Sequence, residues 1–183
     1  GGKQVVLVDA DMRKPVQHEL FSLPNAVGLT TALVRGVVPD IYQDTFVSGL
    51  RLVTSGPIPP NPAELLGSST MGALIDAFAS EADFVIYDAP PVMAVTDAVL
   101  LAPRLDGVIL TIRLGVTSRD AAQRTKQLLS GARSRLLGVV LNQVKPGRGY
   151  GYYHYYYYEG DSGSELSGKE AVAVSNGEAT GGR

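Results

Sequence analysis

The chain has 183 residues, 45% of them hydrophobic and 19% charged, and its 16 Lys and Arg against 18 Asp and Glu give a formal net charge of -2. This length predicts one domain with a sizeable core, and the balanced charge shows no basic footprint for nucleic acid or an anionic membrane. The absence of cysteine excludes a disulfide framework and a thiolate metal site and is compatible with the cytoplasm, and no apolar run approaches the roughly 18 residues of a membrane helix.

Five short apolar runs rich in β-branched residues are separated by stretches of helical character. This alternation predicts an α/β fold with a mostly parallel sheet flanked by helices. The runs, which we interpret as buried strands, cover Val5 to Val8, Leu50 to Ser55, Phe84 to Tyr87, Gly107 to Ile112 and Leu136 to Leu141.

The segment NPAELLGSSTMGALIDAF, between the second and third runs, predicts a helix. Asn61 can serve as the N-cap, Pro62 suits the first helical position, and Glu64 lies three residues past the cap. The apolar stripe at helical spacing consists of Met71, Leu74, Ile75 and Phe78. A further helix is predicted to begin near Thr117 or Ser118 and to run through RDAAQRTKQLL before Gly131.

Carboxylates follow two of the predicted strands. Asp9 and Asp11 come directly after the first strand, in VVLVDADMR, and Asp88 comes directly after the third, in FVIYDAPP. Ligands of open parallel sheets bind just beyond the carboxyl ends of the strands, and carboxylates are the hard oxygen ligands that Mg²⁺ takes alongside substrate phosphates. A lone strand-end aspartate can equally well cap a helix or start a turn, but two such strands in one chain favour a site.

Several stretches of the sequence, taken in chain order, resemble the motifs of a known protein family. These are VVLVDADMRKPVQHELF, GLTTAL, TSGPIPPNPAELLGS, FVIYDAPPV, VTDA and LLGVVLNQV, followed by the tyrosine-rich YGYYHYYYY. Together they resemble the bacterial tyrosine kinases (BY-kinases) of capsular and exopolysaccharide systems, over nearly everything from Lys3 to Tyr158. The resemblance implies a P-loop ATPase fold, and DMRKPVQHELF is similar to the stand-alone cytoplasmic form of Gram-positive bacteria, which pairs with a separate membrane activator.

The resemblance also implies roles for three carboxylates. Asp9 and Asp11 match the family's second acidic motif, Walker A′, and Asp88 matches Walker B. All three are expected to act in catalysis, with Asp9 as the base that accepts the tyrosine proton and with Asp11 and Asp88 in Mg²⁺ binding. Asp9 and Asp11 could exchange roles. Because phosphoryl transfer has a loose transition state, positioning and charge neutralisation are expected to contribute more than the base.

Three other residues are candidates for the site, and two of them match positions of the family pattern. Arg13 can touch a phosphate of the nucleotide or pair with a neighbouring carboxylate, and surface pairing is the commoner role. Asn142, after the last strand, matches the position where related ATPases read the adenine, with a turn residue as the alternative. Asp97 matches the pattern too, but a carboxylate at a helix start explains it equally well.

The phosphate-gripping loop of these kinases, G-x-x-x-x-G-K-[ST], is nowhere in the 183 residues. Gly2 and Lys3 do not supply it, because a strand follows at once and no helix N-terminus is there to hold phosphates. The family places the loop one strand and one helix before VVLVDAD, and the chain opens on GGKQ, with neither a methionine nor a signal peptide. We therefore expect a truncated kinase that is inactive by itself, with a partial P-loop domain at 1–146, a tyrosine cluster at 147–158 and a disordered tail at 159–183.

The tyrosine cluster is interpreted as the kinase's own substrate. Glycines at 147, 149 and 151 make the segment flexible, and base stacking on nucleic acid would require a basic groove that the sequence does not show. Low-complexity self-association is the other alternative, but it leaves the upstream carboxylates unexplained. The expected phosphorylation sites are Tyr150, Tyr152, Tyr153, Tyr155, Tyr156, Tyr157 and Tyr158.

The resemblance implies ATP and Mg²⁺ as cofactors, and it leads to four expectations about partners. The chain is expected to phosphorylate itself in trans within a ring-shaped homo-oligomer, to meet a membrane activator of the polysaccharide co-polymerase type and a protein-tyrosine phosphatase, and to bind no nucleic acid. Its expected location is the cytoplasm, at the inner face of the plasma membrane. Two alternatives stay open: a partitioning or cell-division-site ATPase, and a non-catalytic subunit of a polysaccharide export assembly.

Overall fold

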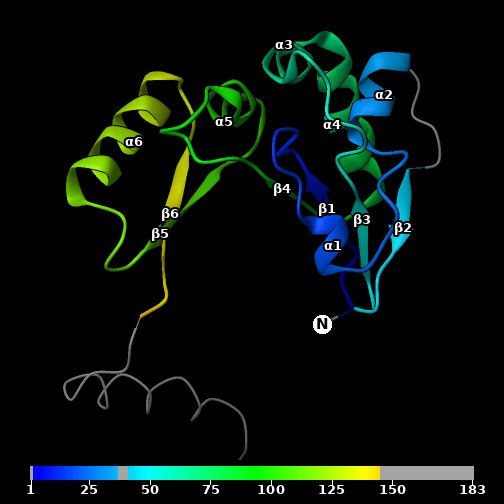
Figure 1. The fold of residues 1–183 in the computed structure, drawn as a ribbon, viewed down its shortest axis with the longest axis horizontal. Helices are drawn as coiled ribbons and strands as arrows, with labels where there is room; N and C mark the ends of the chain where they lie inside the picture. The colour runs from blue at the N-terminus through cyan, green and yellow to red at the C-terminus, as the bar shows by residue number, and fades with distance from the viewer. Residues whose placement is uncertain (1, 37–40, 145–183) are drawn as a thin grey trace, which may run out of the picture. The chain divides into compact units, whose positions relative to one another are not determined.

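The computed structural model describes residues 2–36 and 41–144. These residues alternate strands with helices along the chain (Figure 1). The strands are β1 (Val5–Asp9), β2 (Tyr42–Asp44), β3 (Leu50–Val53), β4 (Phe84–Asp88), β5 (Val108–Arg113) and β6 (Leu136–Asn142). The helices are α1 (Gln17–Leu20), α2 (Leu29–Arg35), α3 (Pro62–Gly67), α4 (Ser69–Glu81), α5 (Asp97–Leu101) and α6 (Arg119–Gly131), with a 3₁₀ turn, η1, at Ala102–Arg104.

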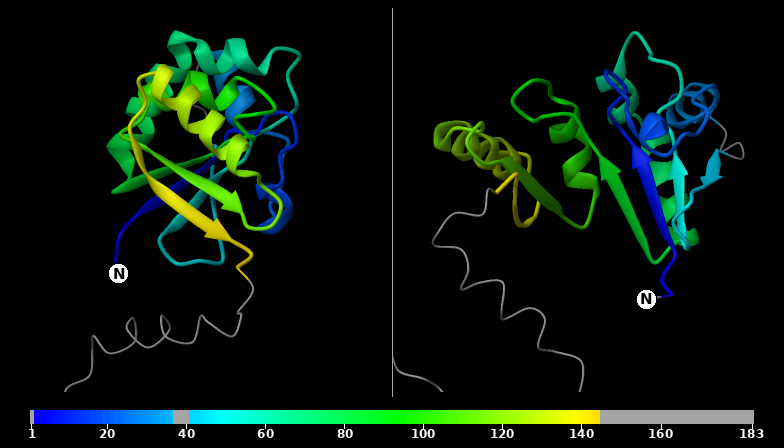
Figure 2. Two further views of the ribbon diagram at one scale, coloured as in Figure 1. Left: turned by 90° about the vertical axis from the view of Figure 1, so that its left-hand side faces the viewer. Right: turned by 60° about the horizontal axis from the view of Figure 1, so that its bottom comes forward.

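The described strands form two sheets, which Figure 2 shows from two further directions. The larger sheet has the order β2-β3-β1-β4, in which β1 pairs in parallel with both β3 and β4, and β2 runs antiparallel to β3. The smaller sheet consists of β5 and β6, paired in parallel. The predicted α/β class with a mainly parallel sheet is therefore confirmed.

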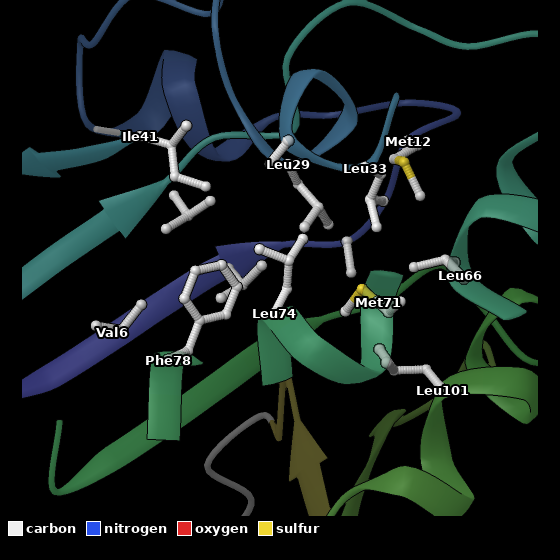
Figure 3. Close-up of a cluster of buried hydrophobic side chains, with 14 residues drawn as sticks. Val6, Met12, Leu29, Leu33, Ile41, Leu66, Met71, Leu74, Phe78 and Leu101 are labelled. Atoms are coloured by element: carbon white, nitrogen blue, oxygen red, sulfur yellow. The ribbon is translucent and has the colours of Figure 1, made fainter. Parts of the chain in front are cut away.

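One hydrophobic core lies against a single face of the larger sheet (Figure 3). Val6 and Val8 of β1 point into it because alternate residues of a strand face the same side. Helix α2 adds Leu29 and Leu33, and α4 adds the side chains of its predicted stripe. Of that stripe, Met71, Leu74 and Phe78 are buried and Ile75 packs at the margin, so the predicted apolar face of this helix is confirmed.

The expectation that all five apolar runs are buried strands is wrong in part. All five runs form strands, but Phe84 and Ile86 of β4 are 59% and 54% exposed, and Ile109 of β5 is 61% exposed. The reason is the pairing of the described strands: β4 is the last strand of its sheet, and β5 has a neighbour only on its β6 side. Apolar side chains of β4 that point away from the core consequently lie uncovered among these residues.

The single helix predicted after Asn61 is two helices. The chain leaves the helical conformation at Ser68, which has φ -71° and ψ 162°, and the Ser68 hydroxyl accepts a hydrogen bond from the Met71 amide to cap α4. The Asn61 side chain, predicted as the cap, makes no capping bond and instead donates to Glu64 at 2.6 Å. Serine at an N-cap satisfies an otherwise free amide, which explains why the second helix begins there.

The predicted start of the later helix is confirmed. Ser118 is the N-cap of α6, and its hydroxyl accepts a hydrogen bond from the Ala121 amide at 3.1 Å. The antiparallel strand β2 and the short helices α1 and α2 were not predicted, because each is too brief to show a clear hydrophobic period, whereas α5 begins at Asp97, as the helix-start alternative for that residue expected. Within the described part of the chain, no helix has the length and apolar character needed to cross a membrane.

Candidate functional site

The two strand-end carboxylate motifs meet at one edge of the larger sheet. Strands β1 and β4 pair in parallel with the register Val5↔Phe84 through Asp9↔Asp88, so Asp9 and Asp88 are direct neighbours at the carboxyl ends. The sheet continues for one more hydrogen bond, from the Ala10 amide to the Asp88 carbonyl at 2.8 Å. Ligand sites of parallel sheets lie just beyond this edge, which is where the sequence motifs were expected to converge.

Asp9 is held in a buried position. Its side chain has no exposed surface, Oδ1 accepts a hydrogen bond from the Asp11 amide at 3.2 Å, and Oδ2 accepts one from the Gln17 amide at 3.1 Å. Burial raises the pKa of Asp9 to about 6, and the charges of Asp88 and Asp11 add to the rise while the two amides oppose it. Desolvation disfavours the charged carboxylate, so Asp9 keeps its proton to a higher pH than an ordinary aspartate.

Asp11 lies on the loop after β1 and is more accessible. Its Oδ1 accepts hydrogen bonds from the amides of Arg13 at 3.0 Å and Lys14 at 2.9 Å. This is the local turn that an aspartate forms with amides two and three residues on. No described residue donates to Oδ2 of Asp11, so that oxygen is available to a ligand.

Gln17 links the two strand ends, and sequence reasoning missed it. It is the first residue of α1, where its backbone amide donates to Asp9 while its side-chain Nε2 donates to Oδ2 of Asp88 at 2.6 Å. One residue therefore contacts carboxylates from both β1 and β4. No pattern in the sequence marks this glutamine, because a polar residue in a loop is ordinary and its partner lies 71 positions away.

Arg13 pairs with Asp97. The guanidinium Nε donates to Oδ2 at 2.8 Å and Nη2 donates to Oδ1 at 2.9 Å, which is a two-bond fork on a carboxylate with no exposed surface. The hydrogen bonding of the guanidinium to Asp97 raises the pKa of Arg13 above its ordinary value. Of the two roles considered for Arg13, carboxylate pairing is the one present. A phosphate contact through Nη1, which donates to no described residue, stays a prediction.

Asn142 belongs to the other sheet. It is the last residue of β6, its side-chain Oδ1 accepts a hydrogen bond from the Gln143 amide at 2.8 Å, and its carbonyl accepts one from the Leu114 amide at 3.0 Å. Gln143 has a positive φ of 57°, so the chain turns sharply after the strand. The turn alternative for Asn142 therefore has a structural basis, and its predicted contact with adenine stays a prediction.

The donor set suits a hard cation with few protein ligands. Within the described residues, no group of three or more His, Cys, Asp and Glu side chains is arranged to hold a metal ion alone. Mg²⁺ in phosphate-binding sites is typically held by only one or two carboxylates, with waters and phosphate oxygens completing the shell. Asp11 and Asp88 meet that requirement in their chemistry, so the residues present fit the predicted ion when a nucleotide supplies the other ligands.

The predicted phosphorylation sites, Tyr150 to Tyr158, lie outside the described residues, as do the tail from Glu159 onward and the end of the predicted kinase domain. The other two tyrosines, Tyr42 and Tyr87, are described. Their hydroxyls are buried without a hydrogen-bond partner among the described residues, and burial raises the pKa of both phenols. Neither hydroxyl is accessible as a phosphate acceptor in this structure.

The curated relatives and the solved structures most similar to the chain point to one family. No family model matches the chain. The tyrosine-protein kinase YwqD of Bacillus subtilis is 43% identical over 145 residues, which are 79% of this chain and 61% of YwqD. The chain therefore spans about three fifths of this relative's length.

Solved structures give the same result. The chimerical protein CapA2B2 has a TM-score of 0.75 at 39% identity, covering 79% of this chain and 65% of that one. The kinase domain of VpsO has a TM-score of 0.73 at 31% identity, covering 79% of this chain and 72% of that domain. The cell-division ATPase MinD of Pyrococcus furiosus, at 18% identity and a TM-score of 0.63, shares the fold alone. By its motifs, its fold and these relatives, the chain belongs to the bacterial tyrosine kinases of the capsule and exopolysaccharide family.

Proposed function

We propose that this chain is the carboxylate-bearing part of a protein-tyrosine autokinase that regulates capsule or exopolysaccharide synthesis or export. The observation that carries the proposal is the register of β1 against β4, which brings the Walker A′ residue Asp9 beside the Walker B residue Asp88. The tyrosine cluster that follows β6 in the sequence supplies the acceptors. The identity to named tyrosine-protein kinases supports the same activity.

The phosphate-binding loop is proposed to come from a segment upstream of Gly1. Two features of the described residues support this. The β4 edge away from β1 and the β5 edge away from β6 have no strand partner, and apolar side chains beside these edges are exposed, including Ile86 and Ile109. An unpaired edge with exposed apolar residues is a site for another strand. We propose that an upstream parallel strand, which leads into the loop, occupies the place between β4 and β5.

In the proposed reaction, the phenol oxygen of a tyrosine attacks the γ-phosphorus of ATP, the bond to the β,γ-bridging oxygen breaks, and ADP leaves. The phenol proton passes to the Asp9 carboxylate, whose pKa of about 6 suits a base near neutral pH. Each carboxylate oxygen has two lone-pair positions, so Asp9 can accept the proton while it keeps its two amide bonds. A Mg²⁺ ion held at Asp11 and Asp88 would neutralise phosphate charge.

The proposed partners follow from the tail and from the family. Each phosphotyrosine adds about -1.5 to -2 charges, so a heavily modified tail is repelled from a site lined by Asp9, Asp11 and Asp88. Phosphorylation in trans within a homo-oligomer therefore limits itself. We further propose a membrane activator that holds the kinase at the inner face of the plasma membrane and a phosphatase that resets the tail.

Substitution of the carboxylates tests the proposal in the full-length gene product that contains this chain. Asp9→Ala, Asp11→Ala and Asp88→Ala should each lower the rate of self-labelling from ATP at least about 100-fold. Asp83→Ala is the matched control, because Asp83 is a partly exposed aspartate that pairs with Lys3 just before β4. A mild effect of all three site variants would remove the site assignment.

Identifying the phosphorylated residues tests the proposal that the tyrosine cluster is the substrate. Mass spectrometry should find phosphate within residues 150 to 158, and replacing all seven tyrosines there with phenylalanine should abolish most labelling while nucleotide binding persists. Phenylalanine keeps the aromatic bulk. ATP hydrolysis without phosphotyrosine would favour the partitioning-type ATPase, whereas a gene with no G-x-x-x-x-G-K-[ST] motif upstream would favour the non-catalytic subunit.

A further inference from the structure

The pair formed by Arg13 and Asp97 connects two loops that leave neighbouring strands. Arg13 lies on the loop after β1, two residues beyond Asp11, and Asp97 begins α5 after the loop that leaves β4 at Asp88. The two residues are 84 positions apart in the sequence. Their contact therefore joins the loop that carries Asp11 to the segment that follows Asp88.

Asp97 depends on this contact. Its side chain has no exposed surface, and Arg13 is the only described residue whose side chain donates to its two oxygens, at 2.8 Å and 2.9 Å. A buried carboxylate without a partner is strongly unfavourable. The guanidinium is planar and donates along two parallel directions, so the fork sets the orientation of Arg13 as well as its distance.

The backbone of Arg13 contacts Asp11. The backbone amide of Arg13 donates to Oδ1 of Asp11 at 3.0 Å, beside the Lys14 amide at 2.9 Å. The Asp11 amide in turn donates to Oδ1 of Asp9 at 3.2 Å. A continuous series of hydrogen bonds thus runs from the buried Asp97 through Arg13 to the carboxylates of the site.

We propose that Asp97 is a positioning residue. By accepting two hydrogen bonds from Arg13, it fixes the loop after β1. The Oδ2 atom of Asp11, which has no described donor, is thereby placed to bind the same cation as Asp88. This inference rests on the proposed function, because it assigns a task within that site. It differs from a general stabilising role in that loss of the fork should change cation binding by molecules that remain folded. Outer-shell contacts that orient metal ligands act in this way.

The proposal is tested by measuring Mn²⁺ binding to the full-length protein with electron paramagnetic resonance, in the presence of ADP. Arg13→Lys keeps a cation beside Asp97 but removes the fork, and Asp97→Asn keeps the shape but removes the charge. Each should weaken Mn²⁺ binding about tenfold, and the double variant should be no weaker than the poorer single variant because both changes remove one contact. Lys3→Gln, which breaks the exposed pair with Asp83, should leave Mn²⁺ binding unchanged.

The outcomes separate the inference from the proposed function. If wild-type protein binds no Mn²⁺ with ADP, the proposed function is wrong and the positioning role falls with it. If wild-type protein binds Mn²⁺ and the Mn²⁺ affinity of folded Arg13→Lys is within twofold of the wild-type value, only the positioning role is overturned. A lowered melting temperature of that variant would then show that the pair of Arg13 and Asp97 is purely structural. Should Asp97→Asn fail to fold, Arg13→Lys alone decides, since it leaves the buried charge compensated.

Discussion

At the scale of single residues, the site is defined by how each carboxylate is satisfied. Asp9 is buried and bonded through both oxygens to backbone amides, Asp11 has one oxygen without a described donor, and Asp88 accepts a side-chain amide. Three aspartates of the same chemistry therefore have three different environments. This difference makes Asp9 suited to hold a proton and Asp11 suited to meet a cation.

The pH dependence of stability should report the burial of Asp9. Its pKa is about 6 in the folded protein and about 3.9 in an unfolded chain, so the folded state binds the proton more tightly. Its contribution is greatest below pH 4 and is lost as the pH rises through 6. The melting temperature of Asp9→Asn minus that of wild type should therefore increase between pH 4 and pH 7.5, by at least about 2 °C.

Asp83→Asn is the matched control for this measurement. Hydrogen bonds from Lys3 and the Gln4 amide lower the pKa of Asp83, so its contribution is present at neutral pH and is lost on acidification. That loss falls at and below the ordinary aspartate pKa of about 4, so the melting-temperature difference of Asp83→Asn should stay nearly constant between pH 4 and pH 7.5. Parallel curves for the two variants would contradict the assigned environment of Asp9.

Gln17 should compete with the cation for Asp88. Its Nε2 donates to Oδ2 of Asp88 at 2.6 Å, and a metal ion that binds at the same lone-pair position of that oxygen displaces the amide. A net hydrogen bond of about 1 kcal/mol corresponds to roughly fivefold in an equilibrium constant. We expect Gln17→Leu to bind Mn²⁺ about fivefold more tightly by calorimetry, with the exposed Gln123→Leu of α6 as control. Weaker binding by Gln17→Leu would show instead that the amide orients Asp88 for the metal.

At the scale of elements, the N-terminus of α2 is joined to the segment that directly follows β3. The first amides of α2, from Leu29 and Thr30, donate to the carbonyls of Thr54 and Ser55 at 2.8 Å. Gly28 permits this approach: a Cβ on it would lie 2.2 Å from the Thr54 oxygen. Its φ of -175° is ordinary extended backbone, so the requirement for glycine is space.

Gly28→Ala should accordingly destabilise the protein. The added methyl group meets backbone atoms of residues 54 and 56, which cannot move without breaking the docking of α2, and the cost should be about 3 kcal/mol. Gly72→Ala is the matched control, because Gly72 lies within α4 with nothing near its Cβ position, and alanine should stabilise that helix by about 0.5–1 kcal/mol. Urea unfolding midpoints measure both. Equal effects would contradict the close approach.

At the scale of the whole molecule, the important feature is that β4 and β5 each lack a described neighbour on one side. The core side of the larger sheet is well covered, whereas the apolar residues of β4 on the other side are exposed. A strand between these edges would pair both and help to cover those side chains. The proposal of an upstream segment therefore has a physical basis in the sheet as well as in the missing sequence motif.

Hydrogen exchange should detect that strand. In the full-length gene product, amides of β4 and β5 that point toward the open edges should exchange at least about 100-fold more slowly than in the 183-residue chain, since pairing protects them. Amides of β1 are paired on both sides and serve as the internal reference, after correction for any difference in global stability. Equal protection of β4 and β5 in both proteins would exclude a strand between them.

The sequence by itself determined the positions of five strands, the stripe of α4, the cap of α6 and the candidate carboxylates. Each of these depends on neighbours within a few positions: an apolar run, a helical spacing, a serine before a helix, an aspartate after a strand. The family resemblance followed from the same local stretches.

Tertiary structure alone decided which side chains meet. Asp9 lies beside Asp88 because β1 and β4 pair in one register, while Gln17 reaches Asp88 across 71 positions and Arg13 reaches Asp97 across 84. Contacts between residues so far apart leave no periodic signal in a single sequence. The exposure of β4 was missed for the same reason: a run such as FVIY reads as buried, but burial depends on which strands and helices lie beside it.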